Sequence, residues 1–123
     1  MIKEIETPKI DFNFSIFNDD KFFYNEENNE YFLEDKNKSK FYFNLKGNLH
    51  RIGKFAIDFY DKRKYWIKNG KYHRLDGPAY IDENYNYSCY YINNIILSQE
   101  KFTEETVHLI CLTCNKFCKQ KCF

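Results

Sequence analysis

Four cysteines near the C-terminus are the residues of this chain whose type and spacing point most directly to chemistry. They are Cys111, Cys114, Cys118 and Cys122. A Cys-x-x-Cys pair is a typical source of thiolate ligands for structural Zn²⁺, and two further thiolates would complete a tetrahedral site. The same positions recur at intervals of three and four residues, which also places them on one stripe of an α-helix.

The zinc interpretation and the helical interpretation conflict. In one straight helix, Cys111 and Cys122 would lie about 16 Å apart and could not share an ion. Three alternatives stay open for the four cysteines: small apolar residues of the core, a zinc site formed where the helix breaks, and disulfides or a redox-sensitive cluster. Cys89 stands alone in an expected strand and is assigned to the core. We predict no cofactor and no bound metal.

Two histidines form a second candidate site. His50 and His73 each precede an arginine and occupy matching positions in two similar segments. Such a pair could act in catalysis or bind a metal, but a residue that recurs in step with a structural unit usually serves that unit. We therefore expect each histidine to hydrogen-bond a neighbouring strand and Arg74 to pair with Asp76. The chain has no nucleophile elbow, Gly-rich phosphate loop or HExxH motif, so we predict that it is not an enzyme.

The middle of the chain interleaves cations with aromatic rings. Residues 36–75 carry a net charge of +10, whereas residues 1–35 carry −7 and residues 76–123 carry −2. Cations beside exposed aromatic rings suit single-stranded nucleic acid. In a hairpin sheet, however, such rings are usually core or ladder contacts, and the acidic first third can neutralise the basic middle. The candidate binding residues are Lys62, Arg63, Lys64, Tyr65, Trp66, Lys71, Tyr72 and Arg74.

The elements that must position these residues are β-hairpins. In the segment 65–81, "YWIKNGKYHRLDGPAYI", a turn at Asn69-Gly70 is predicted to join a strand at 65–68 to an extended segment from Lys71, because both turn residues tolerate positive φ. Pro78 has no amide hydrogen, so pairing stops there before a strand at 79–81. The aromatic content of 20% also favours strands.

Upstream of these hairpins the sequence predicts three further strands. Residues 9–17 alternate apolar with polar side chains, which is the pattern of a half-buried strand whose inner side chains are Ile10, Phe12, Phe14 and Ile16. Shorter strands are expected at 21–24 and at 31–33, on either side of an acidic loop at 25–30.

From residue 41 onward the pattern repeats. When the two copies are aligned, His50-Arg51 falls on His73-Arg74, and Tyr42-Phe43 falls on Tyr65-Trp66 at the same offset. Residues 90–94 open a third, truncated copy. A unit of this size cannot bury its own apolar face, so we expect the hairpins to stack into an array.

Two residues could begin a helix after the last hairpin. Ser98 is one candidate N-cap, and Thr103 is favoured because Glu104 and Glu105 then lie in the first turn, where the helix dipole stabilises carboxylates. We predict a helix over 103–121 that packs on the sheet.

The segment "NGKYHRLDGPA" carries a resemblance to a known family. It is similar to the "W-Y-x-N-G-x-x-H-R-x-D-G-P-A" repeats of small phage, bacterial and giant-virus proteins, which resemble MORN repeats. The copy at 65–79 is nearly complete, the copy at 41–56 is degenerate, and "NNIILSQEKF" resembles the segment that closes such arrays before a helix. The resemblance covers about residues 41–102. It implies flat arrays of β-hairpins that serve as structural components or as modulators of host machinery.

Together these observations predict one mainly β (β+α) domain, an antiparallel meander of β-hairpin repeats in one curved sheet with a C-terminal α-helix against it. Acidic strands occupy 1–40, MORN-like hairpin repeats 41–97, and a Cys-rich helix 98–123. The predicted function is non-catalytic binding of a protein partner, with nucleic acid as the alternative; we do not expect a membrane surface, and no oligomeric state is predicted.

Composition also bears on the origin and location of the protein. The mean hydropathy is −0.74, no apolar run is long enough to span a membrane, and the N-terminus does not resemble a signal peptide. We therefore expect a cytoplasmic location, in the host cytoplasm or the virion if the protein is viral. The abundance of Asn, Lys, Ile, Tyr and Phe suits an AT-rich genome, which favours a virus or a low-GC bacterium.

Overall fold

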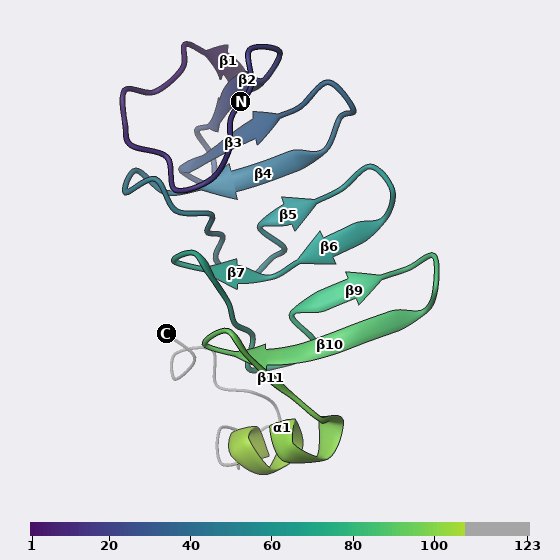
Figure 1. The fold of residues 1–123 in the computed structure, drawn as a ribbon. Coiled ribbons are helices and arrows are strands. Elements are labelled where there is room, and N and C mark those ends of the chain that lie inside the picture. The colour runs from purple at the N-terminus through teal and green to yellow at the C-terminus, as the bar shows by residue number, and fades with distance from the viewer. Residues whose placement is uncertain (108–123) are drawn as a thin grey trace.

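The computed structural model describes residues 1–107, and Figure 1 shows them as a ladder of antiparallel strands that ends in a helix. One nine-stranded sheet has the order β1-β2-β3-β4-β5-β6-β9-β10-β11, so nearly all strands lie beside their neighbours in the sequence. The fold is thus mainly β with one C-terminal helix, as predicted. The strands of this sheet are β1 (Ile2–Ile5), β2 (Lys21–Asn25), β3 (Glu30–Glu34), β4 (Lys40–Phe43), β5 (Ile57–Asp58), β6 (Arg63–Tyr65), β9 (Tyr80–Asp82), β10 (Tyr87–Ile92) and β11 (Ile95–Leu97).

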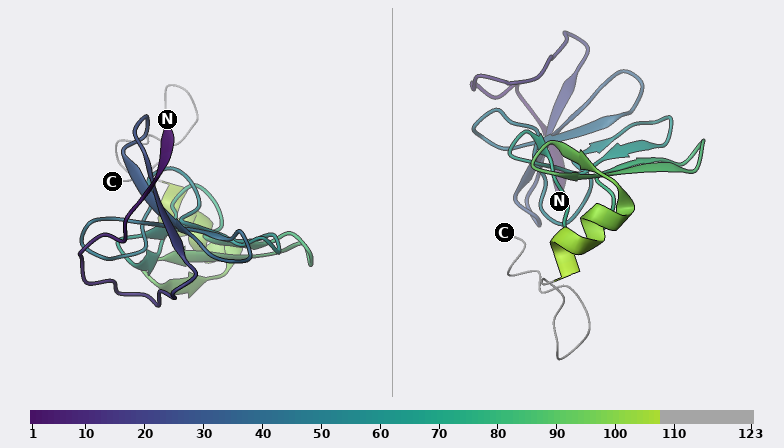
Figure 2. Two further views of the ribbon diagram at one scale, coloured as in Figure 1. Left: turned by 90° about the horizontal axis from the view of Figure 1, so that it is seen from above. Right: turned by 60° about the horizontal axis from the view of Figure 1, so that its bottom comes forward.

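A second, two-stranded sheet consists of β7 (Ile67–Lys68) and β8 (Lys71–Tyr72). The strand predicted at 65–68 is therefore two strands. Tyr65 pairs with Tyr80 in the large sheet, whereas Ile67 pairs with Tyr72 across the short hairpin. The turn between β7 and β8 is the predicted one, with φ of 48° at Asn69 and 81° at Gly70. Figure 2 shows that the strands also rotate along the array, as the right-handed twist of strands requires.

The predicted strand at 9–17 is wrong. Residues 6–20 form a long loop, and the edge beside β2 is taken instead by β1, which the alternating pattern did not indicate. The pattern still reports burial at three of the four predicted inner positions, because Ile10, Phe12 and Phe14 pack against a core cluster of Phe22, Leu33 and Phe43, whereas Ile16 is 38% exposed. Alternation shows which side chains face the core, and this loop gains that burial without a ladder of strand hydrogen bonds.

The backbone contacts of successive hairpins are alike. Ala56 donates its N–H to the carbonyl of Tyr65 at 2.8 Å, and Ala79 donates to that of Cys89 at 2.9 Å. The Tyr42 N–H donates to the carbonyl of Ala56 at 2.7 Å, and the Trp66 N–H donates to the carbonyl of Ala79 at 2.6 Å. Tyr42 thus holds the position of Trp66 and not of Tyr65. The number of residues from Tyr42 to Trp66 is therefore slightly larger than the number from His50 to His73. The reason is that the turn after β4 is longer than the turn after β7.

The helix α1 (Gln99–Thr106) begins earlier than predicted. Ser98 is its N-cap, and the Ser98 hydroxyl accepts a hydrogen bond from the Lys101 N–H at 3.1 Å. Thr103 lies inside the helix and donates its hydroxyl to the Gln99 carbonyl at 2.9 Å. The earlier start brings Phe102 onto Tyr90, with ring centroids 4.6 Å apart, and leaves Phe102 6% exposed. The remainder of the predicted helix and the cysteines at 111, 114, 118 and 122 lie outside the described residues.

Candidate functional site

Five tyrosines of the C-terminal half meet on one side of the sheet, and we call them the tyrosine face: Tyr65, Tyr72, Tyr80, Tyr87 and Tyr91. Tyr65 on β6 is the direct partner of Tyr80 on β9, which in turn faces Cys89 on β10. Side chains alternate along a strand, so Tyr87 and Tyr91, two residues either side of Cys89, point the same way. Tyr72 reaches the group from β8.

The five rings form a continuous chain of contacts. Ring centroids lie 4.7 Å apart for Tyr65 and Tyr80, 6.2 Å for Tyr80 and Tyr87, 5.5 Å for Tyr65 and Tyr72, and 5.2 Å for Tyr72 and Tyr91. These separations are those of stacked and edge-to-face aromatic pairs. The rings therefore support one another in one ordered surface.

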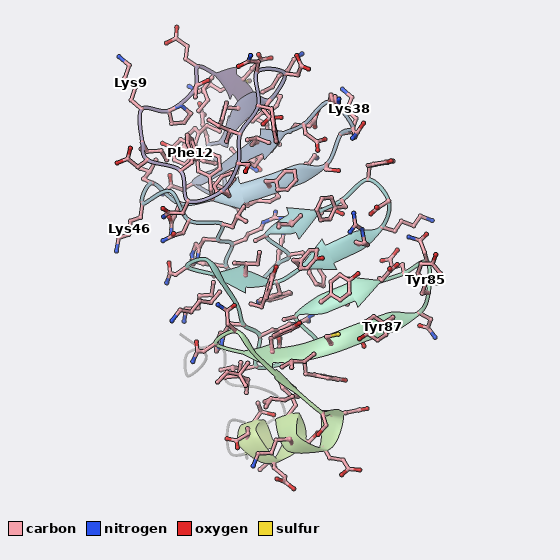
Figure 3. The ribbon with its side chains drawn as sticks, in the orientation of Figure 1. Lys9, Phe12, Lys38, Lys46, Tyr85 and Tyr87 are labelled. Carbon is pink, nitrogen blue, oxygen red and sulfur yellow. The ribbon has the colours of Figure 1, made fainter. Side chains whose placement is uncertain are left out.

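The tyrosine face is open to solvent. Tyr87 is 54% exposed and Tyr72 is 37% exposed. Burial raises the pKa of Tyr65, of Tyr80 and of Tyr91, while a hydrogen bond to the Cys89 thiol raises the pKa of Tyr87. These four hydroxyls stay protonated and can both donate and accept hydrogen bonds. Figure 3 shows Tyr87 on β10, next to Tyr85 at the tip of the β9–β10 hairpin.

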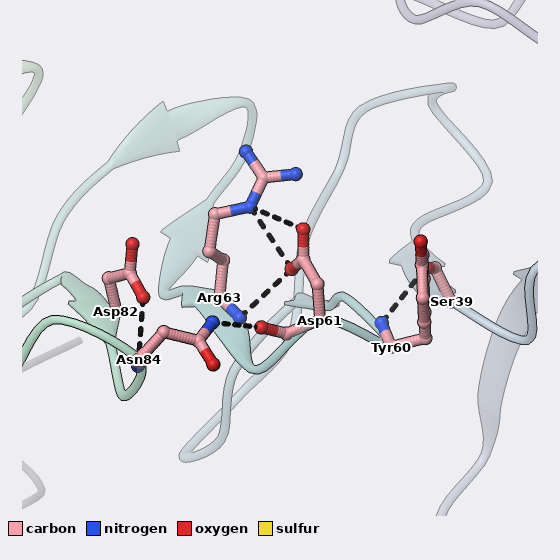
Figure 4. Close-up of polar contacts among 6 residues, drawn as sticks. All are labelled: Ser39, Tyr60, Asp61, Arg63, Asp82 and Asn84. Atoms are coloured by element: carbon pink, nitrogen blue, oxygen red, sulfur yellow. Dashed lines mark hydrogen bonds and ion pairs between the residues drawn. The ribbon is translucent and has the colours of Figure 1, made fainter.

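Polar contacts between hairpin tips hold the strands that carry these rings, as Figure 4 shows. The Ser39 hydroxyl accepts from the Tyr60 N–H at 3.0 Å, and the side-chain amide of Asn84 donates to the Asp61 carbonyl. Arg63 donates to both carboxylate oxygens of Asp61, at 3.0 and 2.9 Å. Each tip is thus tied to the next, which fixes the spacing of the strands under the tyrosine face.

The eight predicted binding residues do not form one surface. Tyr65 and Tyr72 belong to the tyrosine face, whereas Trp66 follows Tyr65 in extended chain and points to the opposite side. Arg74 goes with Trp66, since its guanidinium carbon lies 3.9 Å from the centre of the indole ring. Arg63 lies two residues before Tyr65 on β6 and so points to the side of the tyrosine face, where its guanidinium carbon lies 4.5 Å from the ring centre of Phe59. The remaining three are Lys62 in the β5–β6 turn, Lys64 on β6 and Lys71 on β8.

Three members of the tyrosine face were missed in the sequence analysis. Tyr80, Tyr87 and Tyr91 sit outside the basic middle segment, so the interleaving of cations and rings gave no signal for them. The signal was present in another form. Tyr87, Cys89 and Tyr91 alternate in the sequence along what the structure shows as β10, and Tyr80 begins β9, which pairs with it.

On the opposite side, two arginines stack on aromatic rings in the same way. Arg51 lies 3.6 Å from the ring centre of Tyr42, pairs with Glu30 at 2.9 Å and donates to the Phe55 carbonyl. Arg74 repeats this pattern on Trp66, where it pairs with Asp76 at 2.8 Å and donates to the Pro78 carbonyl. The predicted pair of Arg74 and Asp76 is confirmed. Both guanidinium groups are used within the fold.

Each histidine was predicted to hydrogen-bond a neighbouring strand, but the structure places the bond one step further on, at the turn of the next hairpin. Nδ1 of His50 accepts the N–H of Asn69 at 2.9 Å, and Nδ1 of His73 accepts the N–H of Asn93 at 3.1 Å. Burial is the main cause that lowers the pKa of both imidazoles, with Lys68 adding to the effect. A neutral ring with a free Nδ1 lone pair is what an acceptor needs. Each histidine therefore joins its hairpin to the next.

Small-ligand and metal sites find little support in the part of the chain that the structure describes. A cleft of about 430 Å³ lies beside the Arg51–Glu30 pair, but those two charged groups already satisfy each other. No three His, Cys, Asp or Glu side chains among residues 1–107 are placed to share a metal ion. Over the same residues, no helix is both long and apolar enough to cross a membrane.

Comparisons of the chain with protein-family models, with curated proteins and with solved structures gave no match.

Proposed function

We propose that this protein is a non-catalytic binding module that recognises another protein through the tyrosine face. The observation that carries the proposal is a chain of five tyrosines in mutual contact, at least two of them more than a third exposed. Tyrosine buries a large apolar ring, loses little side-chain entropy on binding and offers a hydroxyl to the partner, and for these reasons it is enriched at protein interfaces.

The pairing of the cations favours a protein partner over nucleic acid. Arg63 pairs with Asp61 at 2.9 Å, Lys64 with Glu83 at 3.2 Å and Arg74 with Asp76 at 2.8 Å. Binding of a phosphate backbone depends on cations that are free to replace its counterions. Three of the predicted basic residues would first have to leave a carboxylate. Binding of nucleic acid is therefore the alternative result that the nuclease arm of the test below would reveal.

We also propose that the hairpins are repeats of the MORN-like kind. The support comes from contacts that recur from one hairpin to the next: the histidine to the following turn, the arginine onto an aromatic ring and the alanine to the following strand. In such an array each unit buries the face of its neighbour. One side of the array is then left for a partner.

The test is affinity capture from a cell lysate, with and without nuclease, with identification of the bound species by mass spectrometry. The bait is the full chain, either unchanged or with Tyr72→Ala and Tyr87→Ala. The matched control carries Tyr60→Ala and Tyr85→Ala, because these tyrosines are 65% and 82% exposed and lie at hairpin tips. Denaturation curves of both double variants establish that the fold is intact.

We expect a specific protein that survives nuclease treatment, is lost with the Tyr72/Tyr87 variant and is kept by the Tyr60/Tyr85 control. Loss of all specific partners on nuclease treatment would replace the proposal with nucleic-acid binding. A protein that binds both variants equally would show that the interface lies elsewhere on the molecule.

A further inference from the structure

The last strand of the sheet, β11, ends the array with an open edge. Ile96 lies opposite Tyr91 of β10, in the pair that follows Ile92 and Ile95 beside the two-residue turn. Because hydrogen-bonded and non-hydrogen-bonded pairs alternate in an antiparallel ladder, the N–H and carbonyl of Ile96 point away from β10, and no backbone hydrogen bond outside the ladders of the described strands involves them. Its side chain and that of Ile95 are 58% and 63% exposed. Two isoleucines on an unpaired strand edge are unusual, because such edges invite pairing with another chain.

In the β7–β8 hairpin, the residue equivalent to Ile96 is Tyr72, and its backbone groups have hydrogen-bond partners. Tyr72 lies opposite Ile67 as Ile96 lies opposite Tyr91. The Tyr72 N–H donates to the side-chain carbonyl of Asn94 at 2.7 Å, and the Tyr72 carbonyl accepts the Asn94 N–H at 2.8 Å. Both backbone groups of this residue therefore point away from their own hairpin. At Ile96 the corresponding N–H and carbonyl have nothing to meet within the described chain.

We propose that a second copy of this chain pairs with β11, antiparallel and about a two-fold axis that passes between the two Ile96 residues. In an antiparallel ladder, residues that face each other directly can exchange two N–H to carbonyl hydrogen bonds. Ile96, whose backbone N–H and carbonyl both point away from β10, can therefore pair with Ile96 of a second copy. Such self-complementarity is the requirement of a two-fold interface. Ile96 and Ile95 would lose exposed apolar surface in the same step.

The other edge of the sheet is less suited to this pairing. β1 carries Lys3 and Glu4 in its four residues, and Lys3 forms an ion pair with Glu26 at 3.3 Å. Charged side chains on an edge strand oppose edge-to-edge association. β11 has three apolar residues and no charge. Pairing of β11 with β11 closes after two copies, whereas pairing of β11 with β1 would continue into a filament.

Because the paired strands are short, the dimer should be weak and visible only as concentration rises. Stable interfaces bury well over about 1,000 Å² in total, which two three-residue strands alone do not supply. We therefore expect a reversible monomer–dimer equilibrium.

Sedimentation velocity of the full chain, from micromolar to millimolar concentration, tests the proposal. Ile96→Pro removes the outward N–H and loses no hydrogen bond of the monomer, and proline is accepted at edges whose N–H faces solvent. Ile96→Lys places a charge on the same edge. The matched control is Ile2→Lys, because Ile2 is 55% exposed on the other edge strand. We expect dimers for the unchanged chain and for Ile2→Lys, and monomers for both Ile96 variants.

Hydrogen exchange of the unchanged protein gives a second measurement that does not depend on a variant folding. Exchange at the Ile96 amide should slow as protein concentration rises, while exchange at exposed amides of the hairpin tips stays constant. The proposal would be overturned if the protein stayed monomeric at every concentration, if Ile96→Pro still formed dimers, or if larger species grew. It would also be overturned if the exchange rate of the Ile96 amide did not change with protein concentration.

Discussion

At the scale of single residues, hydrogen bonds to neutral imidazoles join the hairpins. His50 and His73 each offer Nδ1 to the backbone N–H of the following turn, at Asn69 and Asn93. Burial lowers the pKa of both rings below the ordinary value of 6.5. Protonation would replace the acceptor by a donor and break the bond, so these contacts depend on pH.

The first prediction is a loss of stability in mild acid. The unfolded chain takes up protons on these histidines near pH 6.5, whereas the folded chain takes them up only at lower pH. The contribution is therefore fully present above about pH 6.5 and declines as the pH falls below it. In urea titrations at pH 8 and pH 5, the double variant His50→Asn/His73→Asn, which keeps an uncharged acceptor, should lose much of this decline.

His108 is unchanged in both proteins, so the difference between them reports on His50 and His73. Replacement of either histidine by alanine leaves the turn N–H without this acceptor and should cost about 1 kcal/mol at pH 8. Identical pH profiles for the unchanged chain and the double asparagine variant would show that the histidines do not carry the effect.

The histidine and arginine contacts are the part of the structure that the sequence predicted best. Their spacing is fixed by the hairpin, so a residue that recurs with the hairpin must meet the same neighbours each time. The tyrosine face was harder to predict. Its members come from four strands, and their meeting depends on the register of β6, β9 and β10, which local patterns do not specify.

At the scale of elements, the loop of residues 6–20 is held to the first hairpin by a close backbone approach. Asn13 donates its N–H to the Gly47 carbonyl at 2.7 Å. A Cβ at Gly47 would lie 1.8 Å from the carbonyl oxygen of Asp11, and Gly47 has a φ of +87°. Only glycine allows the loop to lie against this turn.

The second prediction compares two glycines with similar backbones. Gly53 has a φ of +73° and nothing within 4 Å of a built Cβ. Gly53→Ala should therefore cost about 1 kcal/mol from backbone strain alone, and Gly47→Ala should cost about 2 kcal/mol more because the loop must move. Urea denaturation measures both, and hydrogen exchange at Asn13 follows the loop. Equal costs would mean that the loop is not held at Gly47.

The third prediction concerns the start of α1. Ser98→Ala removes the acceptor for the Lys101 N–H and should cost about 1 kcal/mol. Thr103→Ala places a better helix former inside the helix and should be neutral or slightly stabilising. Thermal unfolding of the two variants distinguishes these effects. A larger cost at Thr103 would move the helix start to the residue that the sequence favoured.

The helix start and the loop at 6–20 show why local patterns were insufficient for these elements. Acidic residues after Thr103 fit a first turn, but the helix has Ser98 as its N-cap, and Phe102 in its first turns packs on Tyr90. Ile10, Phe12 and Phe14 alternate as in a strand, yet β1 occupies the available edge. In both cases packing between distant segments overrides a local preference.

At the scale of the whole molecule, the two ends of the array differ. The loop of residues 6–20 covers the turn after β4, which contains Gly47. At the last hairpin, by contrast, β11 leaves Ile95 and Ile96 exposed. The tyrosine face lies between these ends on β6, β8, β9 and β10. The two proposed contacts, of the tyrosine face with a different protein and of β11 with a second copy, therefore use different residues.

The affinity of a captured partner for the tyrosine face tests the proposed function most directly. We would measure it by titration calorimetry for the unchanged chain, for Tyr72→Ala/Tyr87→Ala and for the Tyr60→Ala/Tyr85→Ala control, at low and at physiological salt. We predict at least a tenfold loss of affinity for the Tyr72/Tyr87 variant, no comparable loss for the control, and little change with salt. Equal affinity of the two double variants, or an affinity that falls steeply with salt, would contradict it.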